Sequence, residues 1–449
     1  MCSFLGFNYK IKDLNFINYF SQKRGPDLTN IEVFNDHTFL HNLLSITGDL
    51  TKQPFLQDNI VALFNGEIYN YKKFNFECKS DGEVIIPLYK KYGPNFCTHL
   101  DGEYAIVIYD FKNNKVILST DTFATKPLWY AKQDIKTGFA SYKSCLDRAG
   151  FKSPIKVQAN TTLVLDLKSY EIEEEIENYS FDLNQFKTTY DDWMLAFSES
   201  IKKRTSNIRE KIYIGLSSGY DSGAIACEMA NQNINFKSFS IKAKEDESII
   251  KQRHDLLSKN NLDTEMIFLS KKQYNLSKSN IKQTSEDFQY QIPRLGKITP
   301  NEMMSNDKGA IGLYYISKRA RNEGYKIYLS GQGADEIFSD YGFAGRRFYE
   351  HSTFGGLFPS NLETVFPWNS FYQGTQFSYL GKEENIPGSL GIEGRYPFLD
   401  FSVVQEFLWL HPKLKNSNYK SVLREYLVMN RFPFKENEKV GFSCDYGLL

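Results

Sequence analysis

The chain of 449 residues has no excess of either charge, because 54 Lys and Arg balance 54 Asp and Glu. That balance removes the usual electrostatic reason for a nucleic acid or an anionic membrane to bind. The chain also lacks any apolar run close to the ~20 residues of a membrane span. Its start, MCSFLGFNYK, lacks the basic and apolar regions of a signal peptide. We therefore expect no nucleic-acid partner and no membrane segment.

Cysteine is scarce and scattered. The six cysteines include no Cys-x-x-Cys pair, so neither a disulfide framework nor a structural zinc site is expected. A reducing, cytoplasmic setting is the corresponding prediction. A content of 41% hydrophobic and 24% charged residues is typical of a chain that folds. At ~150 residues per domain, the length predicts two or three domains.

Short strand-like runs dominate the first half of the chain. Residues 60–64, 104–109 and 115–118 are apolar and are separated by polar turns, which predicts an antiparallel sheet system. Residues 81–92 carry apolar side chains at helical spacing and predict one helix. The acidic segment 170–187 has weak periodicity, and we interpret it as a linker.

In the second half, strands and helices alternate. This alternation predicts a parallel sheet covered by helices on both faces. The predicted strands are residues 212–216, 236–241, 266–269 and 326–329, and the predicted helices include 223–231 and 310–321.

Cys2 is a candidate nucleophile, because removal of Met1 would put its thiol and a free α-amino group on one residue. Such an amine, with a pKa of ~7.7–8.0, can serve as a local base. Alone, a cysteine at this position indicates little. Asn65, Gly66 and Glu67, however, directly follow an apolar run, which places an amide, a glycine and a carboxylate at a strand end. Asp81 follows Ser80 at a predicted helix start, where capping alone would explain it.

Two loops in the second half follow predicted strands. Residues 217–222, SSGYDS, join a strand to a helix and would direct backbone N–H groups and hydroxyls at an anion. Asp221 would repel phosphate unless Mg²⁺ bridges the two. Residues 330–336, SGQGADE, repeat this logic, with Asp335 as a second oxygen ligand. Because parallel strands share one carboxyl edge, the two loops predict a nucleotide crevice. A plain serine- and glycine-rich turn is the alternative for the first loop.

These segments together resemble the glutamine-dependent asparagine synthetases over nearly the whole chain. Their order and spacing carry the resemblance, since each segment alone is a weak signal. The matching segments are 24–27, 44–46, 65–70, 80–84, 126–128 and 139–141 in the first half, and 216–222, 330–336, 393–400 and 439–442 in the second.

The resemblance implies a fold and a division of labour. An α+β N-terminal domain, an Ntn-type αββα sandwich over residues 2–180, would hydrolyse glutamine to ammonia. An α/β C-terminal parallel-sheet ATP-pyrophosphatase domain, residues 190–449, would adenylate a carboxylate with ATP and Mg²⁺. The implied small-molecule partners are glutamine, ATP and a carboxylate acceptor, with aspartate as the default, and a homodimer is among the assemblies that the resemblance allows.

The resemblance also implies roles for individual residues. In the first half these are Cys2 as the nucleophile, Asn65 and Gly66 as the oxyanion hole, and Arg24, Glu67 and Asp81 as glutamine-binding residues. In the second half, the implied ATP-binding residues are Leu216, Ser217, Ser218, Gly219, Tyr220, Asp221, Ser222, Ser330 and Gly331. Asp221 and Asp335 would hold the metal, and Lys439 would neutralise phosphate charge in the transition state.

Three positions depart from the family pattern. Leu43 stands where an arginine clamps the α-carboxylate of glutamine, Gln332 where an acid takes part in amidation, and Ser218 where glycine is usual. Residues 288–309 are also longer than expected and could shape a different acceptor pocket. Two alternatives follow: amidation of a non-aspartate carboxylate, such as a sugar uronic acid or a metabolite acid, or a degenerate nucleotide-binding homologue. A cyclising ligase like β-lactam synthetase is a third, and Cys2 argues against it.

Overall fold

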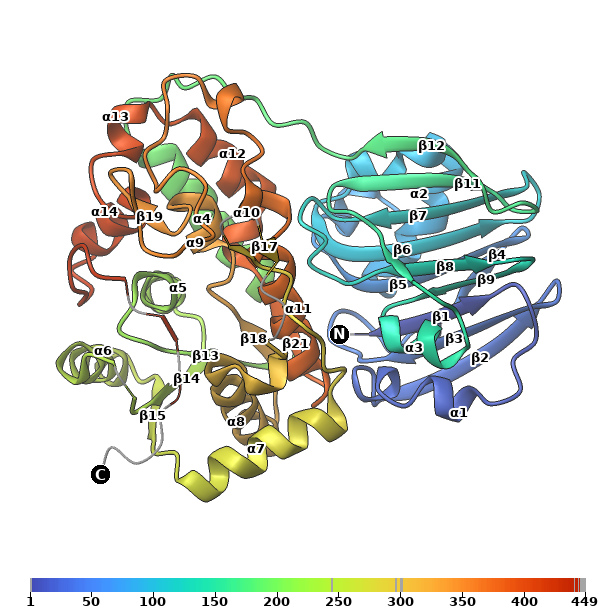
Figure 1. Ribbon diagram of the computed structural model, residues 1–449, viewed down its shortest axis with the longest axis horizontal. Coiled ribbons are helices and arrows are strands. Elements are labelled where there is room, and N and C mark those ends of the chain that lie inside the picture. Colours follow the sequence, from blue (N-terminus) through green and yellow to red (C-terminus); the bar gives the residue numbers. More distant parts are fainter. Residues whose placement is uncertain are drawn as a thin grey trace. The chain divides into compact units, whose positions relative to one another are not determined.

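The computed structural model divides the chain into two units (Figure 1). The first comprises Met1–Ser180 with the short segments Asn207–Arg209 and Gly388–Ile392, and the second comprises Phe181–Ser206, Glu210–Pro387 and Glu393–Leu449. The domain ranges 2–180 and 190–449 remain a proposal beside this division. The structure describes residues 2–243, 245–294, 297–298, 302–439, 441–442 and 444.

Two six-stranded antiparallel sheets form the first unit, as the sequence predicts for this half. One sheet has the order β10-β8-β9-β1-β3-β2 and the other β12-β11-β7-β6-β5-β4. The strands of the first sheet are β1 (Ser3–Phe7), β2 (Leu28–Phe34), β3 (His37–Leu43), β8 (Trp129–Gln133), β9 (Lys136–Ala140) and β10 (Ile155–Lys156). Those of the second are β4 (Phe55–Gln57), β5 (Ile60–Ile68), β6 (Gly102–Asp110), β7 (Lys115–Thr120), β11 (Thr161–Asp166) and β12 (Ile172–Glu177).

The inner strands of each sheet are buried on both faces. In β5, Leu63 packs in the core between the two sheets, while its neighbour Phe64 packs on the other face with the helix α2 (Ile85–Tyr92). In β1, Phe4 joins the same core between the sheets, and Leu5 packs outward with residues of the helix α3 (Lys143–Arg148). This two-residue alternation produces four layers: helix, sheet, sheet and helix.

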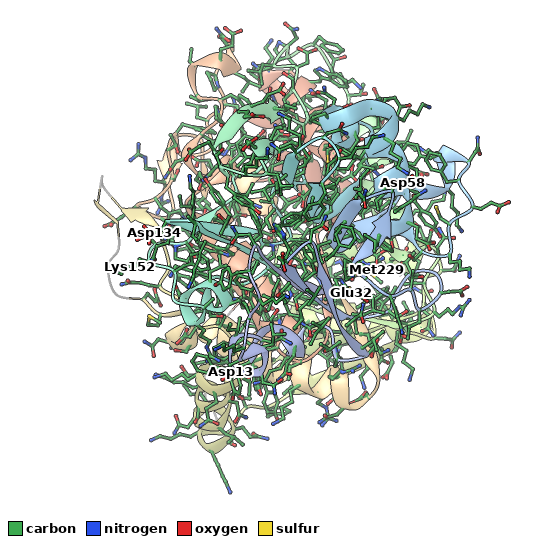
Figure 2. The ribbon with its side chains drawn as sticks, turned by 90° about the vertical axis from the view of Figure 1, so that its right-hand side faces the viewer. Asp13, Glu32, Asp58, Asp134, Lys152 and Met229 are labelled. Carbon is green, nitrogen blue, oxygen red and sulfur yellow. The ribbon has the colours of Figure 1, made fainter. Side chains whose placement is uncertain are left out.

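Tight two-residue turns join neighbouring strands of the first unit. Asp58 and Asn59 connect β4 to β5 with φ angles of 53° and 63°, and Asn35 and Asp36 connect β2 to β3 with φ of 48° and 63°. Asn and Asp tolerate these left-handed conformations, which match the twist of a hairpin. The charged side chains Asp58 and Asp134 lie exposed on such turns (Figure 2).

The predicted helix over residues 81–92 is confirmed, but it begins as a 3₁₀ turn (Asp81–Val84) before α2. Ser80 caps this turn, in a capping box with Glu83. The linker predicted at 170–187 is wrong in part, because Ile172–Glu177 forms the strand β12 at a sheet edge. Its acidic side chains are exposed there, and charge of this kind protects an edge strand from unwanted pairing.

A five-stranded parallel sheet with the order β15-β14-β13-β18-β21 forms the centre of the second unit, as the alternating pattern predicts. The strand predicted at 266–269 begins three residues earlier and ends two residues earlier, and the exposed Phe268 follows it. The strands are β13 (Lys211–Gly215), β14 (Phe236–Ile241), β15 (Asp263–Ile267), β18 (Tyr325–Leu329) and β21 (Glu393–Arg395).

Helices accompany this sheet. The larger ones are α4 (Asp191–Thr205), α5 (Tyr220–Asn231), α6 (Glu247–Lys259), α7 (Lys271–Thr284), α8 (Lys308–Asn322), α11 (Thr375–Gly388), α12 (Phe401–Trp409) and α14 (Ser421–Met429). Shorter elements of the chain are α1 (Leu14–Ile17), α9 (Ala334–Phe338), α10 (Asn369–Tyr372), α13 (Pro412–Lys415) and the two-stranded ribbons β16–β17 (Pro293–Arg294, Lys297–Ile298) and β19–β20 (Gly342–Phe343, Arg346–Arg347).

The strand order reverses next to β13. From β13 the chain proceeds to β14 and β15 on one side, and later to β18 and β21 on the other. The carboxyl ends of β13 and β18 therefore flank a topological switch point, where parallel sheets bind their ligands. Among the described helices, none is both long and apolar enough to cross a bilayer.

Candidate active sites

Cys2 directly precedes β1 in the first unit, and its side chain is buried, with 7% of the residue exposed. Its Sγ lies against the Leu44 backbone, 3.5 Å from the amide nitrogen, which donates to it, and 3.7 Å from the carbonyl oxygen. Strand β1 pairs with β3 on one side and β9 on the other, so the backbone next to the thiol is fixed from both sides.

A small pocket opens beside Cys2. Three carboxylates, Asp49, Glu67 and Asp81, contribute to its wall, whereas no Lys or Arg lines it within the described part of the chain. Leu43, at the position predicted to have lost its cation, is part of this wall. The remaining lining residues are Leu44, Ser45, Ile46, Thr47, Thr51, Gln53, Phe64, Gly66 and Ser80.

Asn65 and Gly66 lie near the end of β5. Asn65 is fully buried, and neither Oδ1 nor Nδ2 has a hydrogen-bond partner among the described residues. It does not line the pocket, but by alternation it shares the face of β5 that packs on the first sheet. Gly66 has a φ of +140°, and a Cβ there would lie 1.9 Å from the Glu103 carbonyl oxygen. Only glycine therefore fits, and a buried amide without a partner stands next to it.

Glu67 and Asp81, both predicted to bind glutamine, line the pocket and are nearly buried. The Ile68 backbone N–H donates to Asp81 Oδ2 at 2.8 Å, which fixes that carboxylate against the end of β5. Asp81 thus has a tertiary role beyond the helix start where the sequence places it.

Arg24 lies behind the nucleophile rather than in the pocket wall. It is fully buried, its Nε donates to the Cys2 carbonyl oxygen at 3.0 Å, and its guanidinium stacks on the Tyr142 ring at 5.0 Å. These contacts position the Cys2 backbone. The role in glutamine binding predicted for Arg24 has no support from this placement.

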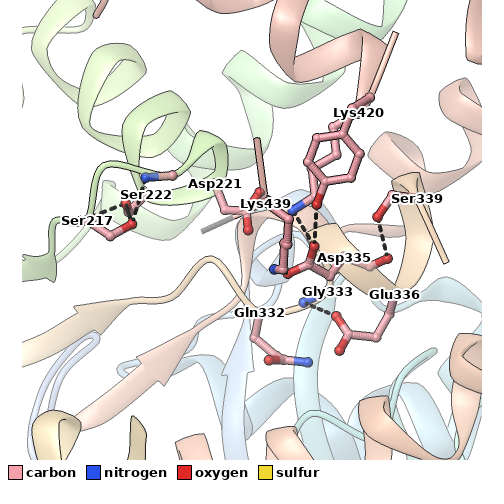
Figure 3. Close-up of polar contacts among 12 residues, drawn as sticks. Ser217, Asp221, Ser222, Gln332, Gly333, Asp335, Glu336, Ser339, Lys420 and Lys439 are labelled. Carbon is pink, nitrogen blue, oxygen red and sulfur yellow. Dashed lines mark hydrogen bonds and ion pairs between the residues drawn. The ribbon is translucent and has the colours of Figure 1, made fainter. Parts of the chain in front are cut away.

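The two predicted phosphate loops meet in the second unit, at the carboxyl ends of β13 and β18. A Cβ at Gly331 would lie 2.9 Å from Asp221 Cβ, so the loops are in direct contact. Figure 3 shows residues of both loops, and these loops line a shared pocket. Of the predicted ATP-binding residues, six line it: Ser217, Gly219, Asp221, Ser222, Ser330 and Gly331.

Hydrogen bonds within the first loop define its shape. The Ser217 amide donates to Ser222 Oγ at 3.0 Å, and the Gly219 amide donates to Ser217 Oγ at 3.1 Å. The buried Arg253 supports the loop from behind, donating to the Gly219 carbonyl oxygen at 2.9 Å. The loop leads into the first turn of α5, so hydroxyls and amide groups gather at a helix N-terminus.

Three predicted ATP-binding residues lie outside the pocket lining: Leu216, Ser218 and Tyr220. Leu216 and Tyr220 are buried in the core. The amide and hydroxyl of Ser218 both donate to Glu245 Oε2, at 2.7 and 2.6 Å. That contact gives the Ser218 hydroxyl a structural role which a glycine there could not fill.

Asp221 and Asp335 share a lysine. Lys420 Nζ lies 2.6 Å from Asp221 Oδ1 and 2.7 Å from Asp335 Oδ1, and Lys439 pairs with the other oxygen of Asp335 (Figure 3). The Tyr419 hydroxyl donates to Asp335 at 3.0 Å. The pair is thus placed so that one cation contacts both carboxylates.

The pKa values of the two carboxyls shift in opposite directions. Burial raises the pKa of Asp221 above its ordinary value, although Lys420 opposes this. Burial would also raise the pKa of Asp335, but Lys420 and Lys439 outweigh burial and hold that pKa well below its ordinary value. For Lys439, burial opposes the charge, and the carboxylates nevertheless raise its pKa. Asp335 and Lys439 therefore remain an ion pair at neutral pH.

Sequence reasoning missed Lys420. It follows no strand and belongs to no glycine-rich loop, and 199 residues separate it from Asp221. One lysine among 54 basic residues gives no local signal, so only the fold could show it. Part of the segment 288–309, predicted to shape the acceptor pocket, lies outside the described residues; of the described part, Asp307 and Gly309 line the pocket.

Comparisons with known proteins divide the chain in the same way. A glutamine amidotransferase domain model matches residues 1–182, and an asparagine synthase model matches residues 193–383. A putative glutamine-hydrolysing asparagine synthetase of Methanocaldococcus jannaschii is 29% identical over 442 residues, covering 92% of this chain and 76% of that protein. The human enzyme of that name is 25% identical, covering 90% and 76%. Asparagine synthetase 2 of Bacillus subtilis is 38% identical over 128 residues, 26% of this chain and 17% of that protein.

Proposed function

Because the chain belongs to the glutamine-dependent asparagine synthetase family, we propose that it is an ATP-dependent amidotransferase. It hydrolyses glutamine in its first unit and uses the ammonia to amidate a carboxylate that its second unit adenylates. The observation that carries the proposal is the contact of Lys420 with both Asp221 and Asp335. The two carboxylates lie on the predicted phosphate-binding loops, which meet at the switch point of a parallel sheet.

In the proposed glutaminase reaction, the Cys2 sulfur attacks the side-chain carbonyl carbon of glutamine. The α-amino group of Cys2, free after removal of Met1, takes the thiol proton and passes it to the departing ammonia. The buried Asn65 amide and the Gly66 N–H would donate to the oxyanion. Water then hydrolyses the thioester to glutamate. Glu67 and Asp81 face the substrate's ammonium group, and Arg24 is a positioning residue.

In the proposed adenylation, ATP phosphates lie against Ser217, Gly219 and Ser222 at the N-terminus of α5. The Asp221 and Asp335 oxygens are the hard ligands that Mg²⁺ prefers, and one or two carboxylates plus phosphates suffice to bind it. Their contact with a single lysine ammonium shows that both can face one cation. When bound, Mg²⁺ would offset charge on the phosphates. Lys439 would neutralise the charge that develops on pyrophosphate as it leaves.

Aspartate is the first acceptor to test, because the relatives are named asparagine synthetases. A larger carboxylic acid, such as a uronic acid, is the second candidate. The pocket wall favours it: Tyr341, Tyr349 and Tyr379 line the pocket, and Lys382 is its only described cation besides Lys439. Lys382 already contacts two carboxylates, Glu383 at 3.7 Å and Asp307 at 3.9 Å, so it is poorly placed to bind a second acceptor carboxylate.

The remaining sequence predictions become part of this proposal. A cytoplasmic setting stays a proposal, supported by a sequence whose six cysteines include no Cys-x-x-Cys pair. A homodimer stays a proposal that a measurement of molar mass in solution would test. The degenerate-homologue alternative has less support, because Cys2, Asp221, Asp335 and Lys439 all lie in or beside a pocket.

The test is pyrophosphate release with ATP and Mg²⁺ across aspartate, glutamate and glucuronate, each with glutamine or ammonium as the nitrogen source. We expect release that depends on one acceptor, together with one amide per pyrophosphate. Asp255→Asn, an exposed-helix carboxylate outside both pockets, serves as the control for charge removal. Absence of acceptor-dependent release with every acid would contradict the proposal.

A further inference from the structure

Amidation of an acyl-adenylate requires a group that accepts a proton from the attacking nitrogen. Five carboxylates line the pocket of the second unit among the described residues: Asp221, Asp307, Asp335, Glu336 and Glu383. Gln332, which also lines it, cannot accept a proton, because its side chain is an amide. The contacts of each carboxylate show which of them can serve.

Four of the five carboxylates have structural or charge-pairing roles. Asp221 and Asp335 share Lys420. Asp307 caps α8 by accepting from the Gly309 amide at 2.9 Å, and it accepts from the Tyr290 hydroxyl at 2.7 Å. Glu336 accepts from the Gly333 amide on one oxygen and from the Tyr341 hydroxyl on the other. Proton transfer to any of these would break a contact that holds the fold or the phosphate site.

Glu383, on α11, also accepts hydrogen bonds, from the hydroxyls of Ser330 and Tyr328, but neither partner is a lysine of the proposed metal site or a helix-capping amide. Its Oε2 accepts from the Ser330 hydroxyl at 3.1 Å, and the same Ser330 Oγ accepts from the backbone N–H of Gln332 at 3.1 Å. The carboxyl group is therefore hydrogen-bonded to the loop 330–336, which is proposed to hold the adenylate. Lys382 Nζ forms an ion pair with Glu383 Oε1 at 3.7 Å, a distance too long for a hydrogen bond.

We propose that Glu383 is the proton acceptor of the amidation step, an inference that rests on the proposed function. Ammonia attacks the acyl carbon of the adenylate, and the new C–N bond forms with the nitrogen lone pair. One N–H proton passes to the Glu383 carboxylate. The bond between the acyl carbon and the phosphate oxygen then breaks, and AMP leaves with that electron pair. The products are the amide, AMP and protonated Glu383, which returns its proton to water.

The surroundings of Glu383 suit this role. Burial raises the pKa of its carboxyl group above the ordinary value, against the opposing effects of Lys382 and of the Ser330 and Tyr328 hydroxyls; Asp307 adds to the rise. A carboxylate with a raised pKa is a stronger base, and general base catalysis contributes about 10²–10⁴-fold in rate. The side chain is 10% exposed, so a small nucleophile in the pocket can reach it.

The test separates the two half-reactions of the full chain. Acceptor-dependent exchange of labelled pyrophosphate into ATP reports adenylation, and amide formation with ammonium chloride reports the second step. Aspartate is the first probe, followed by glutamate and glucuronate. For Glu383→Gln we expect exchange within about threefold of wild type and amide formation slower by about 100-fold. Glu384→Gln is the matched control: it removes the next carboxylate of α11, which accepts from Tyr396 at 2.6 Å and does not line the pocket. Glu384→Gln should keep the wild-type ratio of the rate of amide formation to the rate of pyrophosphate exchange.

A second variant transfers the carboxylate from position 383 to position 332. Because Gln332 and Glu383 line the same pocket, the double variant Gln332→Glu with Glu383→Gln should recover at least tenfold in amide formation over Glu383→Gln alone. Wild-type amidation by Glu383→Gln overturns the inference, and so does an equal loss of both half-reactions. If wild type shows no exchange with any acid, the proposed function itself fails and the role of Glu383 fails with it.

Discussion

Replacing Leu43 by arginine would give the pocket beside Cys2 a cation that its described lining does not contain. Leu43 ends β3 and is 7% exposed, with its side chain in the pocket wall. If glutamine is the substrate, its α-carboxylate would enter a pocket whose described lining has three carboxylates and no Lys or Arg to pair with it. We therefore expect weak glutamine binding by wild type, with ammonium competing well as the nitrogen source.

The magnitude follows from the missing contact. A charge-assisted hydrogen bond contributes about 1.5–3 kcal/mol, which corresponds to about tenfold to 150-fold in affinity. Other cations near the site cannot supply it, because Arg24 bonds the Cys2 carbonyl and Lys23 Nζ lies 4.5 Å from the Tyr19 ring. Leu43→Arg should therefore lower the KM for glutamine by about tenfold or more, provided that the new guanidinium reaches the substrate.

The assay is glutamate release, titrated with glutamine and with glutaminamide, which lacks the α-carboxylate. The arginine should favour glutamine over glutaminamide, whereas Leu43→Met, a volume-conserving control, should leave the preference unchanged. A low wild-type KM for glutamine that rises in Leu43→Arg would refute the reasoning. Equal improvement for both substrates would refute it as well, because the gain would then not come from the α-carboxylate.

Three further outcomes are expected. Cys2→Ala should abolish glutamine hydrolysis and keep ammonium-dependent amide formation; residual hydrolysis would contradict the nucleophile assignment. Asp221→Asn and Asp335→Asn should each suppress pyrophosphate release with every acceptor, because metal binding needs both carboxylates; full activity of both variants would refute the two-carboxylate site. Asp400→Asn should lower the free energy of unfolding at pH 7 by about 3 kcal/mol, since it breaks a buried ion pair with Arg204 at 2.9 Å. Burial would raise the pKa of Asp400, but its cationic neighbours outweigh burial and lower it. Its contribution is thus present above about pH 4 and lost as the pH falls through the folded pKa. Urea unfolding should therefore show a smaller loss of unfolding free energy for Asp400→Asn at pH 3 than at pH 7. A loss that is the same at both pH values would contradict the assignment.

Local patterns predicted the elements that local chemistry controls. The fully buried strand predicted at 60–64, the capped helix after Ser80 and both loops of the second unit follow from periodicity and turn residues, although the strand β5 continues to Ile68 and contains Asn65, Gly66 and Glu67. Gly66 illustrates the limit of such patterns. The sequence marks it as a glycine at a strand end, but the carbonyl that makes any other residue impossible there belongs to Glu103, on the neighbouring strand.

The sequence by itself determined the two-part organisation, the nucleophile candidate and the pair of loops with Asp221 and Asp335, because each is written in contiguous residues. Only the tertiary structure decided which charges meet. Lys420 reaches both carboxylates because α14 begins beside them, and Arg24 lies behind Cys2 because the strand pairing of the first sheet buries it there. Glu383 likewise meets Ser330 across 53 residues of chain. Such contacts depend on the order of strands and on the packing of helices, and no local spacing of residue types encodes them.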